Sequence, residues 1–232
     1  MLIRTAADSP RVVAAIPADE RLRVIEVYTS VQGESTWAGL PCVFVRLAGC
    51  NLRCTWCDSE WTFRGGEHRS IDDVLAEVAA TGVKLVEVTG GEPLVHRQAI
   101  PLMERLLARG HTVLLETSGS RDIAAVPDGV HVILDLKPPD SGEVEANLWS
   151  NLAHLDRGDE VKFVLASRRD YEWAVAVVRE HALADRCEVL FSTAFGLVNA
   201  ADVVAWMLAD HVPARFQIQM HKVIWPPDAR RV

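Results

Sequence analysis

Three cysteines lie close together in the segment Cys50-Asn51-Leu52-Arg53-Cys54-Thr55-Trp56-Cys57, with the spacing C-x3-C-x2-C. Thiolates at this spacing can reach three corners of a cubane iron–sulfur cluster, which cysteine thiolates ligate. A cluster that only carries electrons takes four cysteines, so three protein ligands leave one iron with an open position. An open metal position is where a substrate or cofactor binds. The segment therefore predicts cluster chemistry on a small molecule.

Two simpler interpretations of the cysteines are a zinc site and a disulfide. Zinc needs four ligands, and the nearest candidate for a fourth is His68. A disulfide scheme leaves one of the five cysteines over. The N-terminus carries Arg4 and Asp8 and lacks the apolar region of a signal peptide, so we expect a cytoplasmic chain, where disulfides are rare. Zinc stays open as the alternative to the cluster.

The composition limits the classes of partner. Hydrophobic residues make up 49% of the 232-residue chain, which is enough for one buried core. No apolar run reaches the roughly 18 residues that cross a bilayer, so we expect no membrane partner. The formal charge of −8 argues against a broad phosphate-binding surface and hence against direct nucleic-acid binding. We expect an irregular N-terminal extension over residues 1–20 and a single core domain over residues 21–232.

Strand and helix patterns alternate along the chain, which is typical of parallel βα units. Ser70 and Asp73 form a capping box before one of the helices. There are too few repeats for an eight-fold barrel, so the pattern predicts an α/β fold with a partial (incomplete) β/α barrel. We expect strands at 22–28, 43–47, 84–88, 112–115, 130–134, 161–165, 188–191 and 216–219, and helices at 71–81, 96–109, 169–183 and 200–208.

Polar motifs follow four of these strands. They are Cys50, Gly90-Gly91-Glu92-Pro93, Glu116-Thr117-Ser118-Gly119 and Asp135-Leu136-Lys137-Pro138. Functional groups of β/α folds lie at the carboxyl ends of the strands. Any one motif could be only a turn, since Gly-Gly and Ser-Gly are common turn dipeptides. Their regular placement favours an active site on one rim.

The cysteine spacing and the Gly90-Gly91-Glu92-Pro93 turn resemble those of the radical S-adenosylmethionine (SAM) superfamily. The resemblance implies a 4Fe–4S cluster whose open iron is chelated by SAM. The glycine pair lets the backbone approach the SAM ammonium, where a Cβ would clash. Trp56 either lies near the adenine or packs over the cluster.

A narrower resemblance, from about Val24 to Pro227, is to the 7-carboxy-7-deazaguanine synthases of queuosine and deazapurine biosynthesis. Its matching segments are Ser30 to Glu34, Phe44-Val45-Arg46-Leu47-Ala48-Gly49-Cys50-Asn51-Leu52, Cys57-Asp58-Ser59, Thr89 to Pro93, Glu116 to Gly119, Asp135 to Pro139, and Gln219 to Pro226. This family resemblance implies a lyase that contracts the ring of 6-carboxy-5,6,7,8-tetrahydropterin with loss of ammonia. It also implies dependence on Mg²⁺, an external one-electron reductant of the flavodoxin or ferredoxin type, and a homodimer.

The resemblance also implies site residues. The cluster would be held by Cys50, Cys54 and Cys57. SAM would be bound by Trp56, Cys57, Asp58, Gly91, Asp135, Leu136 and Lys137, with Ser192–Ala194 as an addition. The pterin would be bound by Val31, Gln32, Gly33, Arg46, Thr89 and Pro226, and Mg²⁺ by Ser59, where many relatives have threonine. The planar fork of Arg46 suits a carboxylate, although a surface ion pair is its other reading. His221 and Lys222 are left outside the set.

Two alternatives remain at this point. One is a different radical SAM enzyme, such as a glycyl-radical activase, which has a similar cysteine spacing and acts on a protein. The other is a binding module stabilised by zinc or by a cluster, which iron and sulfide analysis would distinguish.

Overall fold

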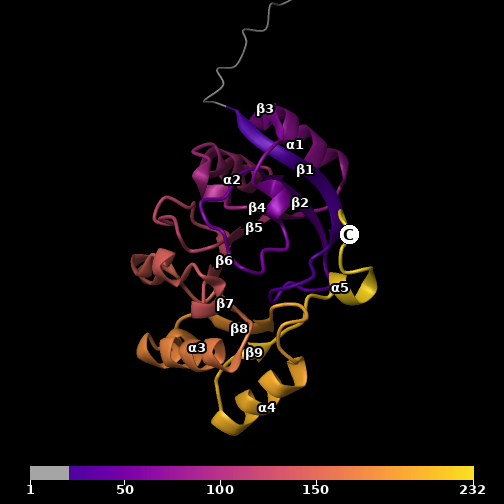
Figure 1. Cartoon of the computed structure of the whole chain (residues 1–232). Helices are drawn as coiled ribbons and strands as arrows, with labels where there is room; N and C mark the ends of the chain where they lie inside the picture. The colour runs from indigo at the N-terminus through magenta and orange to yellow at the C-terminus, as the bar shows by residue number, and fades with distance from the viewer. Residues whose placement is uncertain (1–20) are drawn as a thin grey trace, which may run out of the picture.

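One sheet of nine strands runs through residues 21–232, the part of the chain that the computed structural model describes. The strand order is β3-β1-β2-β4-β5-β6-β7-β8-β9, and the two edge strands do not pair with each other. The sheet curls without closing (Figure 1), which confirms the predicted partial barrel. The strands are β1 (Leu22–Val31), β2 (Pro41–Leu47), β3 (Glu67–Arg69), β4 (Leu85–Gly90), β5 (Thr112–Thr117), β6 (Val130–Leu136), β7 (Glu160–Leu165), β8 (Glu188–Thr193) and β9 (Arg215–Phe216).

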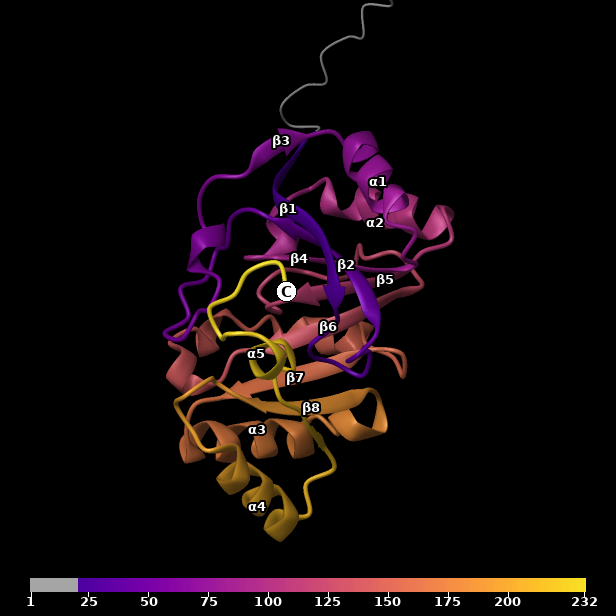
Figure 2. The same ribbon diagram turned by 90° about the vertical axis from the view of Figure 1, so that its right-hand side faces the viewer.

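Helices cover the outer face of the sheet (Figures 1 and 2). They are α1 (Ile71–Ala80), α2 (Ala99–Ala108), α3 (Arg168–Glu180) and α4 (Ala200–Asp210). The short α5 (His221–Ile224) lies elsewhere, and 3₁₀ turns occur at Glu60–Thr62, Pro93–Val95, Pro139–Ser141, Val144–Ala146, Trp149–His154 and Leu183–Asp185. The predicted capping box of Ser70 and Asp73 starts α1. None of the helices within residues 21–232 has the length and apolar character needed to cross a membrane.

The concave face of the sheet changes from apolar to charged along its strands. A small apolar cluster contains Phe44, Leu85, Leu114 and Ile133. Successive side chains of a strand point to opposite faces, so the residue two positions further on shares the same face. Those residues are Arg46, Glu87, Glu116 and Asp135. The alternation therefore closes one end of the barrel with hydrophobic packing and places charged groups toward the carboxyl ends.

Several connections differ from the predicted alternation of strand and helix. β1 runs antiparallel to β2, because the connection over residues 32–40 is too short for a crossover to a parallel strand. No α-helix separates β5 from β6 or β6 from β7. The predicted helix to residue 183 ends at Glu180, since Ala182 adopts a left-handed conformation with φ 47°. The last strand stops at Phe216 instead of residue 219.

The predicted extension over residues 1–20 lies outside the described residues. A single sheet through the rest of the chain is the arrangement expected of one core domain. The boundary at residue 20 stays a prediction.

The segment at α5 covers the open side of the barrel (Figure 2). The backbone N–H of Met220 donates to the carbonyl oxygen of Gly33 at 2.9 Å. Gln219 Nε2 donates to Glu34 Oε1 at 3.0 Å. A Cβ built on Gly33 would lie 2.6 Å from Nδ1 of His221. Only glycine lets the 32–40 loop and α5 approach this closely.

We therefore expect Gly33→Ala to push α5 away and to lower the free energy of unfolding by about 1–3 kcal/mol, as overpacking does. Denaturant unfolding would measure this, and hydrogen exchange at α5 would locate it. Gly158→Ala is the matched control, because its Cβ would meet only the flexible Asp156 side chain at 3.2 Å and an imidazole ring beyond it. Equal stability of the two variants would contradict this account of the contact between the 32–40 loop and α5.

Candidate active site

The cysteine loop is held by hydrogen bonds to the ends of the neighbouring strands. Asn51 Nδ2 donates to Ser120 Oγ at 3.0 Å, after β5. The backbone N–H of Thr55 donates to the carbonyl oxygen of Ser141 at 3.0 Å, and its Oγ1 donates to that of Asp140 at 2.8 Å, both after β6. The loop is therefore held by the segments that follow β5 and β6, two of the strands whose ends the sequence predicted to share one rim.

The glycine pair at the end of β4 (Gly90 and Gly91) allows that strand to lie against the loop. A Cβ on Gly91 would be 2.4 Å from the carbonyl oxygen of Gly49 and 2.7 Å from Cβ of Cys50. A Cβ on Gly90 would be 2.3 Å from the carbonyl oxygen of Leu47. All three distances are too short for any side chain. The pair is thus required by the packing of the chain itself.

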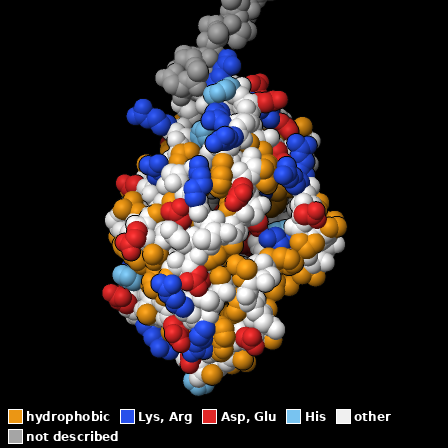
Figure 3. All heavy atoms as spheres, in the orientation of Figure 1, with side chains coloured by type: hydrophobic (Ala, Val, Ile, Leu, Met, Phe, Trp, Pro, Cys, Tyr) orange, Lys and Arg blue, Asp and Glu red, His pale blue; other side chains and the backbone are white. Residues whose placement is uncertain are grey.

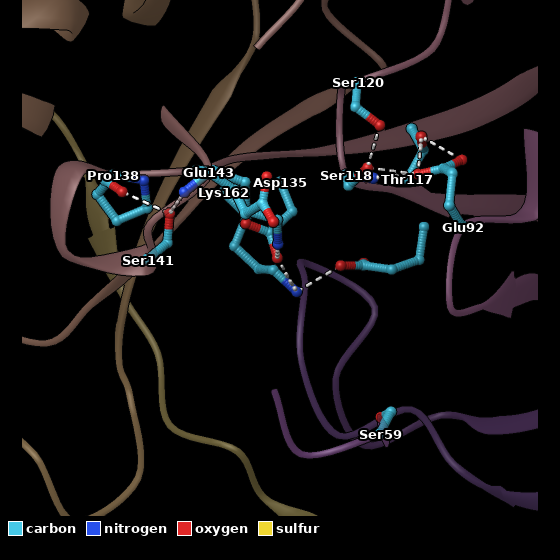
Figure 4. Close-up of polar contacts among 12 residues, drawn as sticks. Ser59, Glu92, Thr117, Ser118, Ser120, Asp135, Pro138, Ser141, Glu143 and Lys162 are labelled. Carbon is cyan, nitrogen blue, oxygen red and sulfur yellow. Dashed lines mark hydrogen bonds and ion pairs between the residues drawn. The ribbon is translucent and has the colours of Figure 1, made fainter. Parts of the chain in front are cut away.

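Glu92 joins β4 to the turn after β5 (Figure 4). Its carboxylate is fully buried and accepts hydrogen bonds from Thr117 Oγ1 at 2.9 Å, Ser118 Oγ at 2.6 Å and Ser118 N at 2.7 Å. Ser118 in turn contacts Ser120, which bonds to Asn51 of the cysteine loop. A chain of hydrogen bonds therefore connects the two polar motifs to the loop.

The three thiols fit a cluster with an open position. Cys50, Cys54 and Cys57 are half-buried, and none of the chain's five cysteines, all within the described residues, forms a disulfide. Burial raises the pKa of the Cys54 thiol to about 11, with Lys137 opposing the shift. Metal binding would remove the proton. Residues 21–232 hold no group of three or more His, Cys, Asp or Glu gathered for one metal ion, whereas a cubane places each thiolate on a separate iron.

The predicted SAM residues of β6 lie beside this loop. Lys137 pairs with Asp135 at 2.9 Å, and that pairing outweighs burial to raise the pKa of Lys137 to about 12. Oδ1 of Asp135 and Oγ of Ser192 are buried without a hydrogen-bond partner among the described residues. Such orphaned groups fit a polar ligand. The Leu136 side chain instead packs into the outer core, which leaves only its backbone for the site.

Asp58 and Ser59 follow the cysteines and are tied to α5. Lys222 Nζ lies 2.7 Å from Asp58 Oδ2, and Ser59 Oγ donates to Asp58 Oδ1 at 3.0 Å. Burial would raise the pKa of Asp58, but Lys222, Ser59 and Gln219 outweigh it and lower the pKa to about 2. The sequence left Lys222 outside the site, whereas the structure brings it to a predicted SAM residue. Figure 4 shows Ser59 apart from the Glu92 network.

Arg46 and Thr89, both predicted to contact the pterin, are direct partners across β2 and β4. Arg46 Nε pairs with Glu26 Oε1 at 3.0 Å, and Nη2 donates to Tyr28 Oη at 3.0 Å. The guanidinium also lies 5.6 Å from the ring centroid of Trp61. The Arg46 side chain is 17% exposed, so its ion pair is not the solvated surface pair considered from the sequence.

The other predicted pterin residues lie at separate positions. Gln32 Nε2 donates to Glu87, and Gly33 contacts α5. Val31 ends β1 opposite Pro41, the first residue of β2, and so lies at the opposite end of β2 from the cysteine loop. Pro226 follows α5 and accepts a hydrogen bond from Ala229 N at 2.9 Å.

Lys162 binds a group of acidic residues on the concave face (Figure 4). Its Nζ lies 2.5 Å from Glu116 Oε1, 3.0 Å from Glu34 Oε2 and 3.7 Å from Asp135 Oδ2. Burial works against the charge of Lys162, but these carboxylates keep its pKa well above the usual value. For Glu116, burial and the neighbouring carboxylates outweigh Lys162 and raise the pKa to about 8.

The sequence analysis missed Lys162, Glu87 and Glu26, as well as Trp61. One signal was present, because a charged residue inside a short apolar strand, such as Lys162 in 161–165, must face a polar interior. Trp61 gave no signal, since a tryptophan in a loop is equally expected in simple packing.

Comparison with known proteins agrees with this geometry. The model of the radical SAM superfamily matches residues 44–140. The 7-carboxy-7-deazaguanine synthase of Koribacter versatilis is 46% identical over 226 residues, covering 91% of this chain and 100% of the relative. That of Chlorobaculum tepidum is 41% identical and covers 91% of this chain and 97% of the relative. The crystal structure of QueE from Escherichia coli has a TM-score of 0.70 at 23% identity, covers 87% of this chain and 95% of that chain, and shows the same fold.

The open barrel and its three-cysteine loop are those of a radical SAM enzyme. Within that superfamily, the chain belongs to the 7-carboxy-7-deazaguanine synthase family. Membership implies a 4Fe–4S cluster and SAM, for which the free thiols and the orphaned polar atoms described above are suited.

The raised pKa of Glu116 predicts a pH effect on stability. Its pKa is 4.5 ordinarily and about 8 in the folded chain. The folded chain therefore holds this proton more tightly, and the resulting stability is complete below about pH 4.5 and is lost as the pH rises through about 8.

We expect the free energy of unfolding to fall relative to that of Glu116→Gln between about pH 5 and about pH 8, by at most about 1.4 kcal/mol per pH unit. Denaturant titrations of both proteins at each pH measure the difference. Glu104→Gln, on the exposed face of α2, should follow the unaltered chain. Parallel curves for all three proteins would refute the proton on Glu116.

Proposed function

We propose that the chain converts 6-carboxy-5,6,7,8-tetrahydropterin to 7-carboxy-7-deazaguanine with loss of ammonia, in queuosine or another deazapurine pathway. The observation that carries this proposal is the similarity to 7-carboxy-7-deazaguanine synthases over nearly the whole chain. The geometry supports it, because the cysteine loop and the Arg46–Thr89 pair lie at the ends of the adjacent strands β2 and β4. When bound, the cluster and SAM supply radical hydrogen-atom transfer.

The residues of the chain would bind and orient the reactants. The cluster would be held by Cys50, Cys54 and Cys57. SAM would be held by Trp56, Cys57, Asp58, Gly91, Asp135, Leu136 and Lys137. The pterin would be held by Val31, Gln32, Gly33, Arg46, Thr89 and Pro226. For Leu136, the contact would be through the backbone. For Val31, the contact is the least supported, because the residue ends β1 away from the cysteine loop.

A magnesium ion is part of the proposal, with Ser59 as its protein ligand. Mg²⁺ prefers oxygen ligands and keeps several waters, so few protein ligands are needed. The Ser59 hydroxyl lies beside the Asp58 carboxylate, which Lys222 holds ionised. These are oxygen donors of the right chemistry.

The proposed partners are an external one-electron reductant of the flavodoxin or ferredoxin type and a second copy of this chain. Figure 3 shows apolar side chains gathered on the side of the molecule where α5 and α4 lie. Exposed members of this region include Phe195, Leu197, Val223 and Ile224. A homodimer that covers them would lower the cost of exposing them to water. The thiol chemistry suits the reducing cytoplasm.

Anaerobic turnover tests the proposal. Purified, cluster-reconstituted protein with the carboxypterin, SAM, Mg²⁺ and a reductant should form 7-carboxy-7-deazaguanine, and Cys54→Ala should abolish both turnover and SAM cleavage. Cys187→Ala is the matched control, because Cys187 is buried away from the loop and should keep activity. A Cys54→Ala protein that still cleaves SAM would rule out its ligand role, and absence of product from the unaltered chain would refute the reaction.

The anchor role of Arg46 predicts a separate effect on binding. Loss of a charge-assisted hydrogen bond costs about 1.5–3 kcal/mol, so Arg46→Ala should raise KM for the carboxypterin roughly 10-fold or more. Cleavage of SAM without substrate should continue, because the cysteines are untouched. Steady-state kinetics and an uncoupled cleavage assay measure the two effects. An unchanged KM would show that Arg46 does not hold the substrate.

A further inference from the structure

The segment after α5 returns to the neighbourhood of Arg46. Figures 1 and 2 both show it running from α5 to a position beside β1. Arg231 Nε lies 3.1 Å from Glu26 Oε2, while the other oxygen of the same carboxylate binds Arg46. Arg230 Cζ lies 4.5 Å from the ring centroid of Trp61, against which Arg46 also lies. Two arginines of the C-terminal segment thus contact both partners of the proposed substrate anchor.

The charge of this group depends on the C-terminal segment. Glu26 is 4% exposed, and alone with Arg46 it forms a neutral pair that attracts an anion weakly. Arg230 and Arg231 change the sum over these contacting side chains from zero to +2. The rest of the molecule works in the opposite direction, because the whole chain carries −8. The positive corner is therefore local and is supplied by the last residues of the chain.

The donors of this corner are only partly used. Arg46 engages Glu26 through Nε and Tyr28 through Nη2. Arg231 engages Glu26 through Nε. Arg230 makes a ring contact with Trp61, and no hydrogen bond of its guanidinium is found within residues 21–232. Planar guanidinium forks with free N–H groups match a carboxylate in two-point geometry.

The geometry points to Arg230 and Arg231 as specificity-determining residues that complete, with Arg46, a binding corner for the carboxylate of the substrate. This inference rests on the proposed function, and it adds residues to the same site. A contribution to stability alone does not explain the contact, because the buried Glu26 already has Arg46 as its counter-charge at 3.0 Å, and a second partner that is 65% exposed adds little. The C-terminal segment is thus expected to select ligands that carry an anionic group.

The test compares two ligands and several forms of the full enzyme. Dissociation constants are measured for 6-carboxytetrahydropterin and for a tetrahydropterin without the carboxylate, both with cluster and SAM loaded. The forms are the unaltered chain, a chain ending at Pro227, Arg230→Ala, Arg231→Ala and Arg231→Lys. Arg215→Ala is the matched control, because Arg215 is also 65% exposed and pairs with Glu188 through Nε at 2.8 Å, on β9.

Removal of the C-terminal segment should weaken binding of the carboxylated pterin about 10-fold or more and leave the other ligand within about two-fold. Each single alanine variant should show part of this loss, Arg231→Lys should restore part of it, and Arg215→Ala should behave as the unaltered chain. Equal weakening for both ligands, or no weakening for either, would overturn the inference. An unaltered chain that neither binds nor turns over the carboxypterin would instead refute the proposed function.

Discussion

The close contact between the glycine pair of β4 and the backbone of the cysteine loop is the constraint on which the site depends. The loop leaves β2 directly beside β4, and the carbonyl oxygens of Leu47 and Gly49 occupy the space that a Cβ would need. Any side chain there would move the thiols away from the strand ends that hold them. Glu92 then fixes the β4 turn to the next turn by accepting hydrogen bonds from the Thr117 hydroxyl and from the hydroxyl and backbone N–H of Ser118. The position of the cysteines is therefore set by packing that needs no ligand.

The charges on the concave face are separated into two regions. Acidic side chains of β4, β5 and β6 surround Lys162. Burial favours the protonated form of Glu87 and Glu116, and the single ammonium of Lys162 does not offset it because several carboxylates share that charge. The pKa of Glu87 therefore rises to about 7 and that of Glu116 to about 8. Arginines gather instead around Trp61 beside β1 and β2. The concave face thus carries both a group of acidic side chains and a cationic corner. This division suits the proposed substrate, which is polar at the edge of its rings and anionic at one end.

The sequence predicted the parts of the structure that local pattern controls. The strand positions, the capping box of Ser70 and the convergence of four polar motifs on one rim follow from alternation, side-chain hydrogen bonding and the direction of parallel strands. It failed where distant segments meet. Nothing in the sequence around Lys222 or Arg231 indicates that these side chains reach Asp58 and Glu26, because those contacts depend on how the chain after β9 crosses the open side of the barrel. The antiparallel β1 was also missed, although the short 32–40 connection permits no parallel crossover.

The open side of the barrel is closed by side chains and single hydrogen bonds instead of by strand pairing. Gly33 with Met220, Glu34 with Gln219, and Asp58 with Lys222 make this seam. Each of these contacts is worth about 1 kcal/mol or less when partly exposed, whereas opening a continuous ladder would break many bonds together. The sheet that holds the thiols and the C-terminal segment that reaches the arginine corner are therefore joined by separate contacts and not by a continuous ladder. The hydrogen bonds of Asn51 and Thr55 in the cysteine loop run to the segments after β5 and β6, while the seam reaches the end of this loop at Asp58, through Lys222.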